Sequence, residues 1–383
     1  MRLLHLSDTH LGYRQYGLVE REDDFYDAFD EAMSIAMKER VEAVIHGGDF
    51  FHSSHPTPRA YREAARRLKE LRGRGIKFFV APGNHELPKG LMKGSPLKVL
   101  EEMELLHSPE RYDMPSEFLL GELSILIFSA RAAEGLFDQE LLRSARGKVK
   151  VALAHLLLCD VSPEVIRGGK CEKGWWAERI PQEYAYVALG DLHYPWGRVI
   201  EGRHVVYPGS TEFTSISEYL QESNRYVVLL EVRGREVEVQ RVRLERVRPW
   251  AQLRGSEEEV MRQISGLRGT GGKPPIVFVE VTSGTSLGRR RVEEALGLLQ
   301  REGKVLTYRY EQRAPEQLRV RVRGEGGLSV EGVLRRLLKE ERLVKAMLEL
   351  LDRPEGAKQF LAELERDRAL LLQLKKALEV KGR

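Results

Sequence analysis

The sequence predicts an α/β fold, and two recurring patterns support that prediction. Short apolar runs bounded by Gly and Pro are typical of buried strands, and they alternate with amphipathic helical patterns. Alternation of this kind predicts βαβ units, in which helices cover the faces of a largely parallel sheet. The strand runs lie at residues 3–6, 41–45, 77–81, 149–154 and 184–189.

The other elements of this region follow from the same patterns. Helical periodicity predicts helices at residues 25–40 and 58–72. Two apolar segments, 226–232 and 237–244, flank Gly234, which predicts a hairpin that closes the first domain.

A smaller α/β unit is predicted for residues 248–323, and a helical pair after it. Its expected elements are helices at 256–267 and 290–301 and strands at 276–281, 305–310 and 318–322. The glycine-rich run 324–327 predicts a flexible joint, and beyond it two apolar stripes predict a helix-loop-helix. We therefore expect three domains, at residues 1–245, 246–323 and 324–383.

Composition narrows the class of protein. The chain has 383 residues, and no apolar stretch approaches the roughly 20 residues that a spanning helix needs, so we expect a cytoplasmic protein with no membrane partner. Its two cysteines, Cys159 and Cys171, are too few for a disulfide scaffold or a four-thiolate zinc site, and we expect ordinary thiols.

Positive charge is concentrated in the second predicted domain. Residues 241–323 contain 18 Lys and Arg, 16 of them Arg, against 10 Asp and Glu. The planar guanidinium group suits phosphate, so this balance favours a phosphate-rich partner such as a nucleic acid. A solvated surface on a heat-adapted domain is the alternative.

Each of the five strand runs is followed by side chains that can bind a metal ion. In open α/β sheets ligands gather beyond the carboxyl ends of the strands, so these side chains can converge on one site. Carboxylate, imidazole and amide ligands together suit Mn²⁺, Fe or Zn²⁺, and seven ligands exceed what one ion needs. Two ions that share a carboxylate, about 3.5–4 Å apart, explain the number. The candidates are Asp8, His10, Asp49, Asn84, His155, Asp191 and His193.

The order of these motifs resembles the calcineurin-like metallophosphoesterases. The longer strings at 8–13, 48–52 and 207–210 are similar to the SbcD-type nuclease, the archaeal meiotic-recombination-eleven subunit of DNA double-strand-break repair. The resemblance implies a β-sandwich flanked by helices, with a smaller α/β capping domain and a C-terminal helix-loop-helix. It also implies an Mn²⁺-dependent exonuclease and endonuclease that processes DNA ends.

The resemblance also implies roles for individual residues. Asp8, His10 and His193 would hold the first ion, Asn84 and His155 the second, and Asp49 would bridge them. The cofactors would be two Mn²⁺ ions, with Mg²⁺, Fe or Zn²⁺ as alternatives. His85 would act at the leaving oxygen or stabilise the transition state, and His52 would place the phosphate; structural roles are the alternative for both. The predicted DNA contacts are Tyr13, Arg14, Arg289, Arg290 and Arg291.

Two positions depart from the family pattern. The family has Gly-His-x-His where this chain reads Gly-Asp-Leu-His at 190–193, so Asp191 replaces an imidazole ligand. A carboxylate adds negative charge, has a shorter reach and prefers a harder ion, which puts the second metal site in doubt. Glu86 follows Gly-Asn-His where Asp is commoner, a milder change.

The resemblance implies two protein partners. Residues 328–383 would dock on an SMC-like coiled-coil ATPase of the SbcC or radiation-fifty type, and packing on their own chain is the alternative. The chain carries no Gly-x-x-x-x-Gly-Lys-Ser/Thr motif for nucleotide hydrolysis. A homodimer would form through a helix beginning at Ser95-Pro96, whose apolar face would be Leu97, Leu100, Met103 and Leu106; internal packing of that face is the alternative.

Two other functions remain open on the same motifs. A small-molecule phosphodiesterase or phosphatase would leave the arginine-rich domain and the terminal helices unexplained. A mainly structural DNA-end tether would follow if Asp191 impairs the metal site.

Overall fold

The computed structural model describes residues 1–87, 94–162, 173–234, 236–267, 272–283 and 286–312. All of them belong to one compact unit, Met1–Ala314. The predicted strand at 318–322, the glycine joint and the terminal helix-loop-helix lie outside the described residues. The predicted domain boundaries stay predictions.

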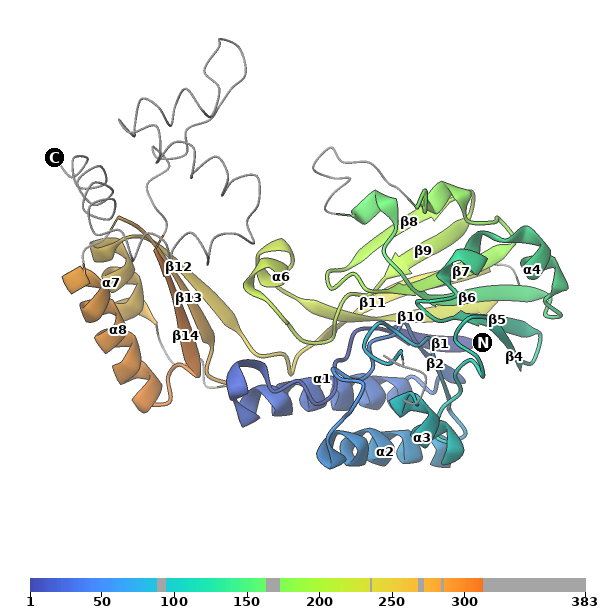
Figure 1. Ribbon diagram of the computed structural model, residues 1–383, viewed down its shortest axis with the longest axis horizontal. Helices are drawn as coiled ribbons and strands as arrows, with labels where there is room; N and C mark the ends of the chain where they lie inside the picture. Colours follow the sequence, from blue (N-terminus) through green and yellow to red (C-terminus); the bar gives the residue numbers. More distant parts are fainter. Residues whose placement is uncertain (88–93, 163–172, 235, 268–271, 284–285, 313–383) are drawn as a thin grey trace, which may run out of the picture. The chain divides into compact units, whose positions relative to one another are not determined.

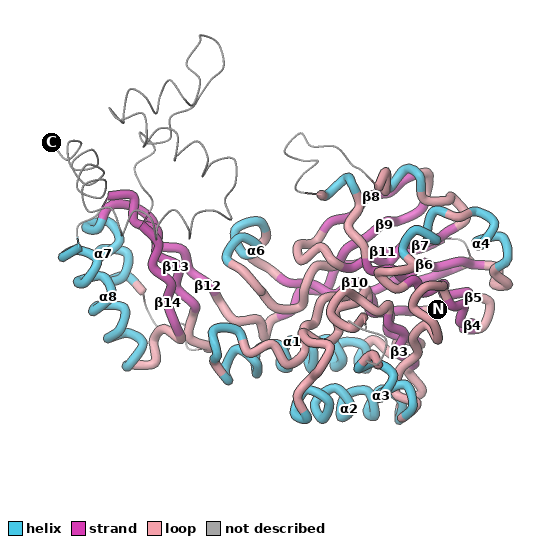
Figure 2. The backbone as a smooth tube through the Cα atoms, viewed as in Figure 1, coloured by secondary structure: helices cyan, strands magenta, loops and turns pink. Residues whose placement is uncertain are grey.

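A five-stranded sheet contains the first three predicted strands (Figures 1 and 2). Its order is β11-β10-β1-β2-β3, and β1 (Arg2–Leu6), β2 (Ala43–His46) and β3 (Lys77–Val80) run parallel. The hairpin β10 (Arg225–Arg233) and β11 (Glu236–Leu244) pairs antiparallel to β1. The hairpin predicted around Gly234 is therefore confirmed.

A six-stranded sheet faces the first one. Its order is β4-β5-β6-β7-β9-β8, with β5, β6, β7 and β9 parallel and antiparallel strands at both edges. The edge hairpins were not predicted; β8 lacks an apolar run, whereas β5 has one at residues 125–128 that was not interpreted as a strand. The strands are β4 (Ser116–Leu120), β5 (Leu123–Phe128), β6 (Val149–His155), β7 (Tyr184–Gly190), β8 (Trp196–Ile200) and β9 (Arg203–Tyr207).

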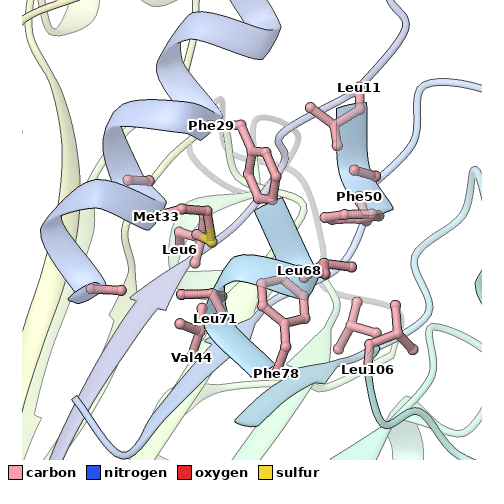
Figure 3. Packing of buried hydrophobic residues seen from close by; sticks show 14 of the residues in the cluster. Leu6, Leu11, Phe29, Met33, Val44, Phe50, Leu68, Leu71, Phe78 and Leu106 are labelled. Atoms are coloured by element: carbon pink, nitrogen blue, oxygen red, sulfur yellow. The ribbon is translucent and has the colours of Figure 1, made fainter. Parts of the chain in front are cut away.

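Alternating side chains of both sheets build three apolar layers. Leu4, Val44 and Phe78 face a layer under α1 (Val19–Lys38), α2 (Pro58–Gly73) and α3 (Pro96–Glu102). Figure 3 shows Phe29 and Met33 of α1 and Leu68 and Leu71 of α2 in this layer. The neighbouring residues on the strands point to the opposite side, because successive side chains of a strand alternate.

Those opposite-facing side chains join the two sheets. Ile45 and Phe79 of one sheet pack with Ile125 and Leu153 of the other. On the far face of the second sheet, Phe128 packs with residues of η2 (Ala133–Phe137) and α4 (Gln139–Ser144). The predicted α/β sandwich flanked by helices is confirmed.

The smaller unit is a three-stranded parallel sheet with two helices. Its strands are β12 (Trp250–Ser256), β13 (Ile276–Ser283) and β14 (Thr307–Gln312), and its helices are α7 (Glu257–Gly266) and α8 (Ser286–Arg301). Strand β12 was not predicted, because only Trp250 and Leu253 of it are buried and its sequence has no apolar run. Helix α7 begins with a capping box between Ser256 and Glu259.

Four short helices complete the described elements. Three of them come after residues of the predicted metal site in the chain: η1 (Gln15–Gly17) after His10, η3 (Cys159–Val161) after His155 and α6 (Ile216–Gln221) after His193. The fourth is η4 (Ala177–Arg179). Helix α1 begins six residues before the predicted start, because the charged first turns at 19–24 hide the apolar stripe.

Helix α3 does not offer the apolar face predicted for a dimer. Leu97, Leu100 and Leu106 are buried in the core under the first sheet, so the internal-packing alternative holds for them. Met103 is 41% exposed. A homodimer stays a prediction, but these leucines do not support it.

The expectation of ordinary thiols is wrong for Cys159, which is disulfide-bonded. Sequence spacing does not reveal whether two cysteines come close enough to pair, since that depends on the Cα separation. Cys171 lies outside the described residues.

Among the described residues, no helix is both long enough and apolar enough to cross a membrane.

Candidate metal centre

The carboxyl ends of five strands meet at one edge of the sandwich. Direct contacts tie the loops that follow β1, β2, β6 and β7: the Asp8 amide donates to the Gly48 carbonyl at 3.0 Å, and the Asp191 amide lies 3.2 Å from Asp8 Oδ2. His155 Nδ1 is 2.8 Å from the Gly47 carbonyl oxygen. The predicted convergence of the strand ends is therefore present in the fold.

Glycine allows this close approach at two positions. A Cβ on Gly48 would lie 2.4 Å from His155 Nδ1, and Gly48 has a φ of +105°. A Cβ on Gly190 would lie 2.2 Å from the Gly47 carbonyl oxygen. Gly48 thus leaves room for the His155 ring, and Gly190 lets the backbones of the two sheets come into contact.

Backbone strain is concentrated in the same loops. Four candidate ligands have left-handed φ values: Asp8 at 51°, His10 at 44°, Asp49 at 52° and Asp191 at 90°. Such conformations cost free energy and persist where the surrounding structure fixes them, which is common at functional sites. The hydrogen bonds from His10 N to Asp49 O and from Leu11 N to Phe50 O hold these loops together.

Two triads of candidate ligands occur in which the ligand atoms of each triad lie within 4.8 Å of one another. One triad is Asp8, His10 and His193, the set predicted for the first ion. The other is Asp8, Asp49 and His155, so Asp8 faces both sets. The described residues also bring His10 together with His52 and His85.

The donor set fits metal ions. His155 Nε2 is buried without a hydrogen-bond partner, and it lies 3.6 Å from Asp49 Oδ2 and 3.7 Å from Asp191 Oδ1. In its neutral form with Nδ1–H donating to the Gly47 carbonyl, His155 has the lone pair of Nε2 available for a cation held beside these carboxylates. A cation would satisfy both the orphaned nitrogen and the negative charge.

The electrostatics of the site indicate the same need for positive charge. Burial raises the pKa of Asp8 to about 7, against the pull of His193 and His155. Burial lowers the pKa of His155, but Asp49, Asp191 and Asp8 outweigh it and raise the pKa to about 9. The carboxylates therefore draw positive charge into a fully buried position.

His10 and His193 face each other through their ring nitrogens. Their Nε2 atoms are 3.2 Å apart, and His193 Nε2 is 3.8 Å from Asp8 Oδ1. His193 Nδ1 lies 2.9 Å from Glu218 Oε1, which directs Nε2 toward His10 and Asp8. Burial lowers the pKa of His193, but Glu218 and Asp8 raise it to about 9.

His85 and His52 lie on the solvent side of His10. The His85 ring is 5.1 Å from each of the other two rings, and His85 Nδ1 hydrogen-bonds the His52 carbonyl oxygen. Tyr13 stacks on His52 at 3.7 Å between ring centroids. Burial and His85 lower the pKa of His52 to about 4, so His52 is neutral near pH 7.

Asn84 and Asp191 line one open pocket. Its volume is about 240 Å³, and its other lining residues are Ala130, His155, Leu156, Leu157, Lys173 and Trp175. Asp191 therefore faces the same space as the two side chains predicted for the second ion. The metal-binding roles of all seven candidates stay predictions, although the structure brings them to one edge.

Glu86 has a role that the sequence did not reveal. It is fully buried and accepts hydrogen bonds from the backbone amides of Gly83, Asp49 and Phe51 at 2.9, 3.2 and 2.8 Å. It thereby joins the loops that follow β2 and β3. Burial and the nearby Asp49 raise its pKa to about 8. Its position directly after Gly-Asn-His was the available signal.

The predicted DNA contacts are dispersed over the described surface. Arg14 is paired with Glu22 at 3.0 Å, and Arg289 with Glu293 at 2.9 Å. Arg290 and Arg291 are exposed on α8. Their contact with DNA stays a prediction.

The model of the calcineurin-like phosphoesterase family matches residues 1–208. A DNA double-strand break repair protein Mre11 of Thermoplasma acidophilum is 31% identical over 298 residues, 74% of this chain and 77% of that protein. The Mre11 protein of Sulfurisphaera tokodaii is 37% identical over 212 residues, 52% of each chain.

A third Mre11 protein, from Saccharolobus solfataricus, is 34% identical over 207 residues, 51% of this chain and 50% of that protein. The chain thus spans about half the length of two of these relatives. Among solved structures, a dimetal phosphatase from Danio rerio is similar at 13% identity and a TM-score of 0.37, over 64% of this chain and 99% of that one.

The family match covers the loops after β1, β2, β3, β6 and β7, where the buried Asp and His side chains converge, and it agrees with the resemblance of the motifs. The chain belongs to the calcineurin-like phosphoesterases, metal-dependent hydrolases of phosphate esters, and within them to the group of the Mre11 proteins.

Proposed function

We propose that the chain is an Mn²⁺-dependent nuclease that processes DNA ends in double-strand-break repair. The observation that carries the proposal is the pair of triads that share Asp8, together with the unpartnered His155 Nε2 in front of Asp49 and Asp191. The names of the relatives, DNA double-strand break repair proteins, support DNA as the substrate.

In this proposal Asp8, His10 and His193 would hold one ion, Asn84, His155 and Asp191 would hold the other, and Asp49 would be a ligand to both. When bound, such ions would supply positive charge for the phosphoryl oxygens and would lower the pKa of an attacking water. The protein contributes a preorganised set of ligands, since its loops are already held by Glu86 and by the glycine contacts.

His85 is the proposed acid for the leaving oxygen. Its Nδ1 is engaged with the His52 carbonyl, so Nε2 is the nitrogen left for a substrate. Nε2 is 3.7 Å from Asp49 Oδ2, so it lies beside the carboxylate proposed to be shared by the two ions. His52 is held between the Tyr13 ring and His85 and would contact the phosphate as a neutral ring.

The Asp191 substitution bears on the alternative of a structural tether with an impaired site. The Asp191 carboxylate lies 3.7 Å from His155 Nε2 and lines the same pocket as Asn84. This position favours a second site completed by an oxygen ligand. Mn²⁺ and Mg²⁺ accept such a ligand more readily than softer ions do.

Partners beyond DNA are proposed from the sequence. Residues 328–383 would dock on an SMC-like ATPase of the SbcC or radiation-fifty type, because two apolar stripes after a glycine joint need a surface to cover them. A truncation after Gly327 should keep metal binding and cleavage of simple DNA but lose co-purification with the ATPase. Unchanged co-purification would overturn this docking.

The function itself is tested with linear duplex DNA and a model phosphodiester, bis(p-nitrophenyl) phosphate. With Mn²⁺, the protein should shorten end-labelled duplex DNA, and duplex DNA should compete with hydrolysis of the model diester. Hydrolysis of the model diester without competition by DNA would favour a small-molecule phosphodiesterase. Binding of DNA ends with no cleavage under any divalent ion would favour the tether.

A further inference from the structure

The ring of His193 is fixed by a buried carboxylate on α6. Glu218 Oε1 lies 2.9 Å from His193 Nδ1, and Thr214 Oγ1 lies 3.1 Å from the same nitrogen. Glu218 is 7% exposed although it is charged. A carboxylate behind a metal-binding histidine sets the ring orientation and raises the basicity of the other nitrogen.

Glu218 also holds the segment 210–218 around this ring. Its Oε2 accepts a hydrogen bond from Thr214 N at 3.0 Å and forms an ion pair with Arg225 at 3.7 Å. Arg225 is buried, and its Nη1 donates to the carbonyl oxygen of His193. The side chain and the backbone of His193 are therefore both held by this group.

The same segment is the contact surface for the β12–β14 unit. The Arg225 guanidinium carbon is 3.9 Å from the Phe213 ring centroid, and the Phe213 ring is 6.2 Å from that of Trp250, the first residue of β12. Phe213 is 1% exposed and Trp250 is 3% exposed. A continuous buried path thus runs from the metal centre to β12.

Charged hydrogen bonds reinforce the path. Glu212, which is fully buried, accepts from Arg248 N at 3.0 Å and from Arg21 Nη1 at 3.3 Å. Arg21 Nη2 donates to the Phe213 carbonyl at 2.8 Å. Both arginines bind Asp24 of α1, so the segment 210–218 lies between two parts of one fixed network.

A further contact places the β12–β14 unit on α1. Lys273 Nζ is 2.9 Å from Asp24 Oδ1 and 2.8 Å from Asp27 Oδ2. Removing one partner of a buried charge network is costly, because the other charge stays buried without compensation. The unit is therefore held firmly in the docked position that the segment 210–218 contacts.

We propose that Glu218 is a positioning residue for the metal centre and that the segment 210–218 couples metal binding at His193 to docking of the β12–β14 unit. This inference rests on the proposed metal site of the nuclease. Coupling of two sites is reciprocal: if docking favours the metal-binding orientation of His193, metal binding must favour docking to the same extent.

The first test is equilibrium Mn²⁺ binding by isothermal titration calorimetry. Glu218→Gln keeps the size of the side chain and removes the charge, and it should weaken Mn²⁺ binding at one of the two sites about 10- to 100-fold. The matched control is Glu222→Gln, four residues further along the chain. The Glu222 carboxylate accepts its hydrogen bonds from Asn224 and not from His193. The control should bind Mn²⁺ as the wild type does.

The second test reads the coupling from the other side by hydrogen exchange. Mn²⁺ should slow exchange of the β12 amides about fivefold or more in the wild-type protein, the low end of common coupling between sites. The effect should disappear in Glu218→Gln. Trp250→Phe, which keeps an aromatic ring at this position, should also weaken Mn²⁺ binding. Glu222→Gln should bind Mn²⁺ with the affinity of the wild-type protein.

The outcomes separate the two proposals. Glu218→Gln with Mn²⁺ affinity within twofold of wild type, or β12 exchange that does not respond to Mn²⁺, would overturn the coupling. A protein that shows both effects but leaves duplex DNA intact would overturn the proposed nuclease and leave the coupling standing.

Discussion

The edge of the sandwich that carries the candidate metal ligands, here called the metal edge, differs from the β12–β14 unit in its buried residues and in its backbone conformations. The metal edge buries Asp8, His10, Asp49 and His155, and three of these four have left-handed φ values. In the β12–β14 unit, no described residue other than glycine has a positive φ. Its core is aliphatic, with members such as Val277, Val279 and Leu296.

The difference shows that the metal edge, and not the core of the β12–β14 unit, combines unfavourable backbone conformations with buried charge. At the metal edge, buried charge and strained backbone are maintained by close glycine contacts and by Glu86, which holds the loops that carry the candidate ligands. In the β12–β14 unit, local preferences agree with the fold, as the capping box at Ser256 illustrates. Substitutions at the metal edge should therefore alter hydrolysis, whereas substitutions on the β12–β14 unit should alter the affinity for DNA.

The largest effect is expected for Asp49→Asn. Asp49 lies within reach of both His155 and His85, and its loss should reduce metal occupancy and hydrolysis together, the latter about a thousandfold or more. Metal content by mass spectrometry and the rate on bis(p-nitrophenyl) phosphate measure the two effects. Two ions per chain in the variant would rule out a bridging role for Asp49.

His85→Ala and His52→Ala should separate chemistry from metal binding. Neither residue is needed to complete the predicted coordination of the two ions, so both variants should retain metal. DNA cleavage should fall by about 10²- to 10⁴-fold for His85→Ala, the range for loss of a general acid. A fall in metal content as large as the fall in activity would mean that these histidines are ligands.

Gly48→Ala should destabilise the metal edge through backbone strain and through a clash with the His155 ring. The added Cβ would lie 2.4 Å from His155 Nδ1 at a residue with a φ of +105°, and we expect a loss of about 3 kcal/mol in the free energy of unfolding.

The matched control is Gly202→Ala in the turn between β8 and β9, where φ is +84° and no atom lies within 4 Å of the added Cβ. Backbone strain alone should cost about 1–2 kcal/mol there. Urea unfolding measures both. Equal losses would mean that contact with His155 is not what requires glycine at 48.

The smallest effect is expected for the double variant of Arg290→Ala and Arg291→Ala on α8. If both side chains contact phosphates, DNA affinity should fall and the slope of log affinity against log salt should become shallower by about 2. Metal binding should not change. Arg62→Ala with Arg74→Ala, two exposed positions of the same charge on and just after α2, is the control. A slope equal to that of the control would remove α8 from the DNA contact.

The sequence alone determined the parts of this protein that follow local rules. Apolar runs punctuated by glycine located β1, β2, β3, β6 and β7, and residues directly after those runs gave the candidate ligands. This succeeded because parallel strands place their carboxyl ends at one edge of a sheet, so short-range spacing carries long-range information. Strands without an apolar run, such as β12 and β4, were not visible in this way.

Only the tertiary structure decided which side chains meet. Several features of the structure depend on contacts between residues distant in sequence or on loop geometry. They are the membership of Asp8 in both triads, the position of Glu86 between two loops, the position of Glu218 behind His193 and the disulfide bond of Cys159. Leu97 and Leu100 read as a free apolar face, yet they are buried in the chain's own core. Sequence periodicity shows that a helix has an apolar face that must be buried. Whether the chain's own core or another protein buries that face is decided by tertiary packing.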